Sequence, residues 1–249
     1  MSNNDDMLSQ EEIDALMNDN DTSEDEELSD KEKDILGEIS NIAMGSAATA
    51  LYSLLDHEVK ITTPKVEFTT FNKLAGEYER PCVIVKVDYI EGLEGFNLLI
   101  IKEDDAKVIA DLMMGGDGTN IDKELDEIHL SAVGEAMNQM MGSASTSISS
   151  IMDEVVNITP PEPEYLKMND AIEQEDKFFE ENEEVISTAF QLKIGDLIDS
   201  SFKQIMPKKF TRQLISRLTE EESGLTVKKS DGEDTKKDKK VAEMVGEKK

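Results

Sequence analysis

The sequence predicts an α+β fold made of two similar halves, each with the element order α-β-β-β-α, around a central, mostly antiparallel sheet with two long helices. Three features support this prediction: an internal repeat, a long helical pattern at the start of each half, and short alternating apolar segments after it. Because only two copies are present, we expect a duplicated fold with a pseudo-two-fold axis and not a solenoid.

The internal repeat relates EISNIAMGSAATAL, which begins at Glu38, to EAMNQMMGSASTSI, which begins at Glu135 and lies 97 residues later. A second pair of segments, GFNLLIIKEDDAKVIADLM and SSFKQIMPKKFTRQLISRL, aligns at an offset of 105 residues. We therefore expect one ordered domain over 31–220, with a first repeat at about 31–118 and a second at about 119–220.

In the first half, a helix is predicted over 31–55. Ser29 and Glu32 have the spacing of a capping box, and apolar residues then follow a period near 3.6 at Ile35, Ile39, Ile42, Ala43, Leu51, Leu54 and Leu55. Extended segments are expected at 59–71, 82–90 and 95–102, and a shorter helix at about 103–114. The stretch CVIVKVDYI alternates as a strand does when one side faces a core.

The second half repeats this order, with a helix at about 122–152, extended segments at about 157–168, 184–195 and 198–206, and a helix at about 207–219. The segment 169–183 has no counterpart in the first half and is interpreted as an inserted acidic loop. Outside the domain, we expect a short peptide at 1–18, an acidic disordered linker at 19–30 and a charged disordered tail at 221–249.

Composition excludes several classes of function. The chain has 249 residues, 26 Lys+Arg and 56 Asp+Glu, and a formal net charge of -30, which argues against binding to nucleic acid or to anionic lipid. One cysteine and two histidines argue against a disulfide scaffold and a multi-ligand metal site. No signal peptide or apolar run of ~20 residues is present, so we expect a cytoplasmic protein without membrane insertion.

The repeated helices carry a matching polar triad: Asp34, Glu38 and Asn41 in the first, Ser131, Glu135 and Asn138 in the second. Spacings of four and three residues place each triad on one helical face. An amide has no useful basicity, but it can hold a water molecule. This suits hydrolysis of an activated phosphoryl group, where positioning is most of the catalytic task. The acid can pair with a cation on a docked partner.

The same residues also fit a simpler interpretation. A single Glu-x-x-Asn is typical of a solvated helix face, and a recent duplication would preserve any residue in both copies. Periodicity alone therefore leaves both interpretations open.

The paired triads, the M-G-S-A that follows each Asn and the duplicated element order closely resemble the CheC/FliY family of chemotaxis phosphatases. The resemblance implies that Asn41 and Asn138 enter the acidic pocket of the phosphorylated response regulator CheY and align water with its aspartyl phosphate. It also implies that Glu38 and Glu135 contact a regulator Lys, with Asp34 and Ser131 in supporting roles. The Mg²⁺ belongs to the regulator, so no cofactor of the chain's own is expected.

Near the N-terminus, the segment LSQEEIDALM is predicted to form a short amphipathic helix that folds on a partner; packing on its own domain is the alternative. It resembles the regulator-binding peptide of the flagellar switch proteins FliM and FliY. Its expected contacts are Leu8, Ser9, Gln10, Ile13, Asp14, Leu16 and Met17.

Peptide and triads together point to the FliY-type members, which usually carry a FliN-like C-terminal domain. We predict no strands of such a domain after residue 220. Three interpretations stay open: the chain is a fragment, it binds the motor by another surface, or it acts in the cytosol. The resemblance implies a place at the cytoplasmic face of the flagellar basal body, with FliM, FliG and FliN as further partners. Two rival functions remain open: a non-catalytic, FliM-like switch scaffold that only binds phospho-CheY, and a small-molecule enzyme with a pocket between the halves.

Overall fold

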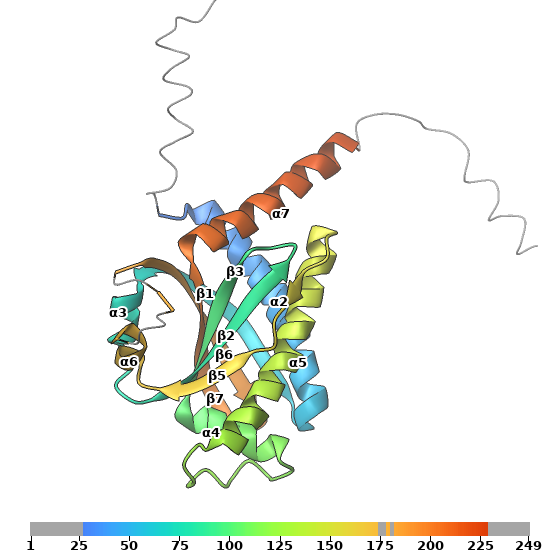
Figure 1. The fold of residues 1–249 in the computed structure, drawn as a ribbon. Coiled ribbons are helices and arrows are strands. Elements are labelled where there is room, and N and C mark those ends of the chain that lie inside the picture. Colours follow the sequence, from blue (N-terminus) through green and yellow to red (C-terminus); the bar gives the residue numbers. More distant parts are fainter. Residues whose placement is uncertain (1–26, 174–177, 180–181, 229–249) are drawn as a thin grey trace, which may run out of the picture.

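The computed structural model describes residues 27–173, 178–179 and 182–228 (Figure 1). The predicted docking peptide at 1–18 and most of the predicted linker lie outside the described residues. The fold is α+β, with two long helices against an antiparallel sheet, and it confirms the predicted duplication. No helix in the described ranges is long and apolar enough to cross a membrane.

The two long helices are α2 (Asp30–Leu55) and α5 (Glu127–Met152), each of 26 residues. Their equivalent positions are 97 residues apart, as the internal repeat predicts, and Ser143 Oγ donates to the Ser46 carbonyl across this offset at 3.0 Å. Figure 1 shows them side by side and running in opposite directions. The pseudo-two-fold axis therefore relates α2 to α5 and passes near Ser46 and Ser143.

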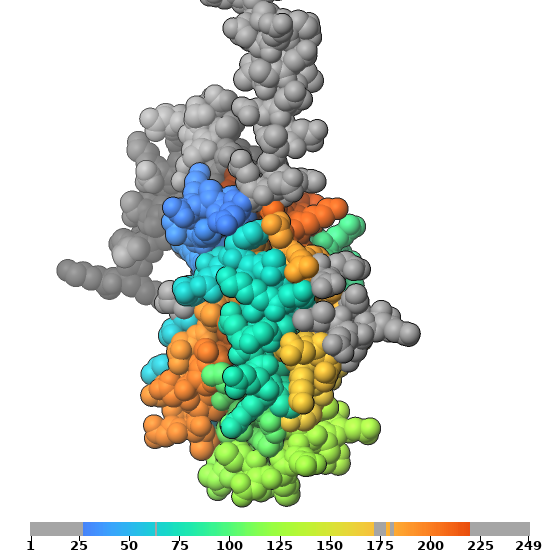
Figure 2. Space-filling view, turned by 90° about the vertical axis from the view of Figure 1, so that its left-hand side faces the viewer, coloured from blue at the N-terminus to red at the C-terminus, as the bar shows by residue number. Residues whose placement is uncertain are grey.

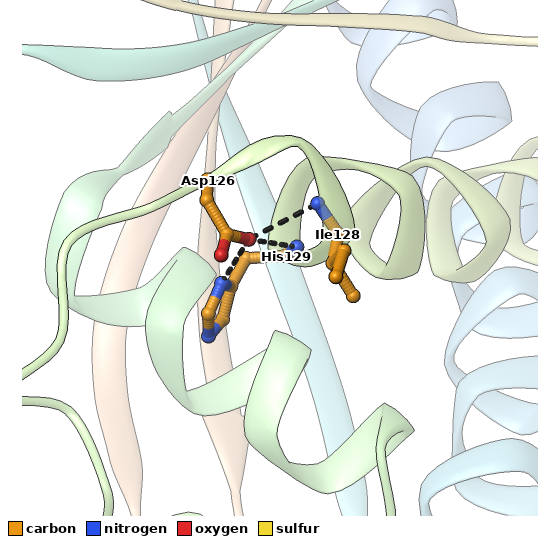
Figure 3. A network of polar contacts seen from close by, with 3 residues as sticks. All are labelled: Asp126, Ile128 and His129. Carbon is orange, nitrogen blue, oxygen red and sulfur yellow. Dashed lines mark hydrogen bonds and ion pairs between the residues drawn. The ribbon is translucent and has the colours of Figure 1, made fainter.

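The capping residues explain where each long helix begins. The predicted capping box of α2 is confirmed: Ser29 Oγ accepts from the N–H of Glu32, and the Glu32 carboxylate accepts from the N–H of Ser29. In α5, Asp126 Oδ1 accepts from the N–H groups of Ile128 and His129, and His129 Nδ1 lies 2.5 Å from the same oxygen (Figure 3). The N–H of His129 lowers the pKa of Asp126. Because Asp126 is the cap, α5 begins at 127 and not at 122.

The sheet has the strand order β1-β6-β7-β3-β2, with β4 and β5 both pairing with β2, and all pairs are antiparallel. Its strands are β1 (Val59–Thr70), β2 (Cys82–Glu91), β3 (Gly95–Lys102), β4 (Asn157–Ile158), β5 (Glu162–Leu166), β6 (Glu184–Ile194) and β7 (Ile198–Pro207).

The pseudo-two-fold axis passes between β3 and β7, where Leu99 pairs with Gln204. These two residues are equivalent at the predicted offset of 105 residues. The first strand of each half pairs with the second strand of the other half: β1 with β6, and β5 with β2. Each half therefore completes the sheet of the other.

The main core lies between one face of the sheet and the helices α2, α5, α4 (Glu103–Met113) and α7 (Lys208–Lys228). Met137, Met140 and Met141 are buried there, as predicted. The opposite face is covered by α3 (Phe71–Ala75) and α6 (Met168–Glu173). In Figure 2, which views that side, the teal segment of α3 and the golden segment of α6 lie next to each other.

This second cover corrects two predictions. Residue 71 begins α3 and does not end a strand, because Thr70 caps the helix and Phe71 turns into the core. The segment 169–183 is not simply an acidic loop: it contains part of α6, and Phe179 packs on Phe71 with ring centroids 4.8 Å apart. Burial of these rings explains why the insertion is held against the sheet.

Other boundaries also differ from expectation. The extended segment 157–168 is split into β4 and β5 by Pro160 and Pro161, since proline cannot donate to a strand ladder. Helix α7 continues to Lys228, so 221–228 of the predicted tail are helical. Leu28, within the predicted linker, is buried in the core. Ile42 was predicted to face the core but is 46% exposed.

Candidate functional site

The first triad lies on the outward face of α2. Asp34, Glu38 and Asn41 are all exposed, whereas residues on the opposite face of the same turns, Leu36, Ile39, Ala43 and Met44, are buried. The amphipathic pattern that anchors α2 therefore orients the triad away from the core. Its polar groups are accessible to a partner that docks against the helix.

The second triad occupies the equivalent positions of α5. Ser131 and Glu135 are exposed, and Asn138 is half-buried. Because both triads lie in the first half of helices that run in opposite directions and touch at Ser46 and Ser143, the two sites lie toward opposite ends of the helix pair (Figure 1). Each predicted triad is thus assembled on its own helix, as a separate site.

Both amide side chains are unengaged within the described part of the chain. Neither Asn41 nor Asn138 forms a side-chain hydrogen bond to another described residue, and the same holds for Glu38. A carboxamide in this state can accept from a water molecule and donate to another group at the same time. Neither Asn is fixed inside the protein as a structural residue would be.

The second site is an open groove of about 390 Å³. Ser131, Glu135 and Asn138 line one side of it. Its other side is formed by Pro160 and Pro161 of the β4–β5 connection and by Pro163 of β5. Helix and proline segment touch closely: a Cβ added at Gly134 would come within 3.2 Å of Pro163 Cγ. At the equivalent Gly37, an added Cβ would meet nothing within 4 Å. Within the described ranges, no residue forms such a wall beside Gly37 at the first site.

One contact in the second site was not predicted from the sequence. Gln139 Nε2 donates to Glu135 Oε1 at 2.8 Å, one helical turn away. The spacing of four residues is the signal that could have revealed this pair. The equivalent residue of the first site is Ile42, which offers no hydrogen bond.

The triads offer carboxylates and an amide at the first site, and a hydroxyl, a carboxylate and an amide at the second. Among the described residues, no group of three or more His, Cys, Asp or Glu side chains could hold a metal ion. The one cysteine, Cys82, lies in β2, and burial raises its pKa to about 12, so it is not a ready nucleophile. The arrangement suits positioning of water and docking of a charged partner.

Similarity to known proteins agrees with this geometry. The CheC-like family model matches residues 32–67 and 128–165, which contain both triads. The chain is 42% identical to FliY of Thermotoga maritima in its crystal structure, with a TM-score of 0.72, covering 78% of this chain and 98% of that one. The chain therefore belongs to the CheC-like family.

Within this family, the similarity is to FliY proteins. The chain is 46% identical over 230 residues to the flagellar motor switch phosphatase FliY of Bacillus subtilis (strain 168), covering 90% of this chain and 60% of that protein. The chain thus spans less than two thirds of the length of this curated relative. The FliM middle domain of H. pylori is 15% identical, with a TM-score of 0.62, covering 76% of this chain and 99% of that one, and it shares the fold alone.

Proposed function

We propose that this chain hydrolyses the aspartyl phosphate of the phosphorylated response regulator CheY at two sites, one on α2 and one on α5. The observation that carries the proposal is the repeated pair of an accessible Asn and a Glu one turn earlier, on two rigid helices related by the pseudo-two-fold axis. The name of the Bacillus subtilis relative, a phosphatase, supports the same class of reaction.

In this mechanism, Asn41 or Asn138 holds a water molecule in line with the bond between phosphorus and the regulator's carboxylate oxygen. Water adds to phosphorus, that bond breaks, the water proton passes to the phosphate, and inorganic phosphate leaves. Glu38 or Glu135 pairs with a Lys of the regulator and fixes the orientation of the complex. Asp34 and Ser131, one turn before each Glu, support this docking. The Mg²⁺ that neutralises the phosphoryl charge is bound by the regulator.

The rival functions are addressed by different observations. A pocket between the halves would favour a small-molecule enzyme. The space beneath α2 and α5 is an apolar void of about 10 Å³, too small for a substrate, and its lining residues are Leu51, Ile101, Ile109, Met137, Met140, Leu192 and Phe202. A larger space of about 410 Å³ lies beside β1 and α3 and reaches Ser187 of the second half, but it contains no residue of either triad. A non-catalytic scaffold would bind the regulator through the same helices, so only a rate measurement separates it from the enzyme.

The deciding measurement is the decay of phosphorylated CheY, followed by release of inorganic phosphate in the presence of Mg²⁺. We expect catalytic amounts of this chain to accelerate the decay well above the spontaneous rate. Decay at the spontaneous rate, together with measurable binding of the regulator, would establish the scaffold instead.

The peptide at 1–18 is proposed to bind the same regulator and to raise its local concentration at the helices. We expect deletion of 1–20 to weaken binding of phosphorylated CheY about tenfold or more, because tethering of this kind commonly contributes that much. Hydrolysis at high regulator concentration should persist. The check is titration of the regulator against both forms of the chain; equal affinities would contradict the tether.

The proposed place of action is the cytoplasmic face of the flagellar basal body, where FliM, FliG and FliN would be further partners. The support is the name of the relative, a flagellar motor switch protein, and the fold shared with the FliM middle domain.

A further inference from the structure

We propose that the two sites recognise the regulator differently, and that Gln139 is the positioning residue responsible at the second site. Gln139 would hold the Glu135 carboxylate ready for its partner, whereas the first site presents Glu38 unrestrained beside the apolar Ile42. This inference rests on the proposed function and extends it to a residue outside both triads.

The first step of the argument is the hydrogen bond itself. Gln139 Nε2 lies 2.8 Å from Glu135 Oε1, which leaves the second carboxylate oxygen available for a cation on the partner. A free Glu side chain loses rotamer freedom when it is immobilised in a complex, and this loss of entropy weakens binding. Because the hydrogen bond from Gln139 already restricts the rotamers of Glu135 in the free chain, less entropy is lost on binding. Gln139 should therefore strengthen binding of the regulator and leave the chemical step unchanged.

The second step is the contrast with the first site. The residue equivalent to Gln139 is Ile42. Its side chain is 46% exposed, whereas the next residue, Ala43, is buried. Glu38 consequently has no side-chain partner among the described residues. The isoleucine side chain has no hydrogen-bond donor, so it cannot orient the Glu38 carboxylate.

The third step is the wall of the second site. The prolines at 160, 161 and 163 face Glu135 and Asn138 across the groove, and Gly134 is closed in by Pro163. A partner side chain that reaches Glu135 and Asn138 therefore lies between α5 and the prolines, whereas no described residue forms such a wall at Gly37 of α2. A fixed carboxylate matters more beside the wall, because the partner has fewer ways to adjust to a misplaced one.

The test uses the full chain with the first site silenced by Asn41→Ala, and measures KM and kcat for phosphorylated CheY. Gln139→Met keeps the length of the side chain and removes the donor. We expect it to raise KM about threefold, the effect of one modest hydrogen bond, and to leave kcat within about twofold. The matched control is Ile42→Met with the second site silenced by Asn138→Ala, where KM should not change because no donor is lost.

A double-mutant cycle shows whether Gln139 acts through Glu135. In the Asn41→Ala background, Gln139→Met should have no further effect on KM once Glu135 is replaced by Ala. An equal effect with and without Glu135 would overturn the positioning role, as would a KM that is unchanged or lowered by Gln139→Met alone. A complete lack of hydrolysis by the Asn41→Ala chain and by the unsubstituted chain would instead reject the proposed function. The same four variants are then compared by their Kd for beryllofluoride-loaded CheY, a measurement that requires no turnover.

Discussion

Replacing both Asn41 and Asn138 by Ala is expected to abolish the acceleration of phospho-CheY decay, while each single replacement leaves the other site active. The amide is the group in each triad that can hold the attacking water, and losing such positioning costs on the order of 100-fold in rate. The double variant should therefore approach the spontaneous rate. The measurement is phosphate release at a fixed, saturating concentration of the regulator.

The control for this experiment is Asn169→Ala, which removes an exposed amide from α6 on the other face of the sheet. It should retain the full rate. Because Asn41 is exposed, Asn138 is half-buried and neither makes a side-chain bond to a described residue, the double variant should unfold at nearly the same denaturant concentration as the original chain. Full activity in the double variant would show that the hydrolysis uses other groups.

Phe202→Ala is expected to cause a large loss of stability. Phe202 is 3% exposed, and its ring stacks on that of its cross-strand partner Phe190 with centroids 5.1 Å apart. It also borders the small apolar void beneath α2 and α5, together with Leu51 and Met137. Truncating a buried Phe costs about 3–5 kcal/mol, and the new cavity would join the void already present. Denaturant titration should show this decrease in the free energy of unfolding.

The matched control is Ile90→Ala in β2, because Ile90 is 65% exposed and its truncation opens no cavity. Its free energy of unfolding should stay within about 0.5 kcal/mol of that of the original chain. A loss below about 1 kcal/mol for Phe202→Ala, well under the usual cost of truncating a buried Phe, would mean that the sheet and helices do not meet at this ring.

Periodicity and repetition predicted the fold well where both act together. The capping box at Ser29 correctly predicted the start of α2. Adding the offset of 97 residues to this cap would also have placed the start of α5 at 127. The short cover of the second sheet face was missed, because α3 is only five residues long and Phe179 lies in an acidic stretch. Neither has enough local pattern to reveal that distant residues bury it.

For the candidate site too, local features were predictable and features that depend on distant residues were not. The faces of the triads were predictable from spacings of three and four residues, since these depend on helix geometry alone. The groove beside Asn138 was not, because its wall comes from prolines more than 20 residues away whose position depends on pairing with β2. Ile42 is apolar but 46% exposed, which shows that hydrophobic periodicity alone does not separate a core residue from an exposed one.

The exchange of outer strands between the halves has a consequence for how such a protein can evolve. Each triad-bearing helix packs on a sheet that its own half does not complete, so deleting either half would leave the other with an unpaired strand edge where β1 or β5 is now bound. A chain of this fold that loses the polar side chains of one triad by point substitution would therefore keep its full length, because the strands of that half still complete the sheet of the other.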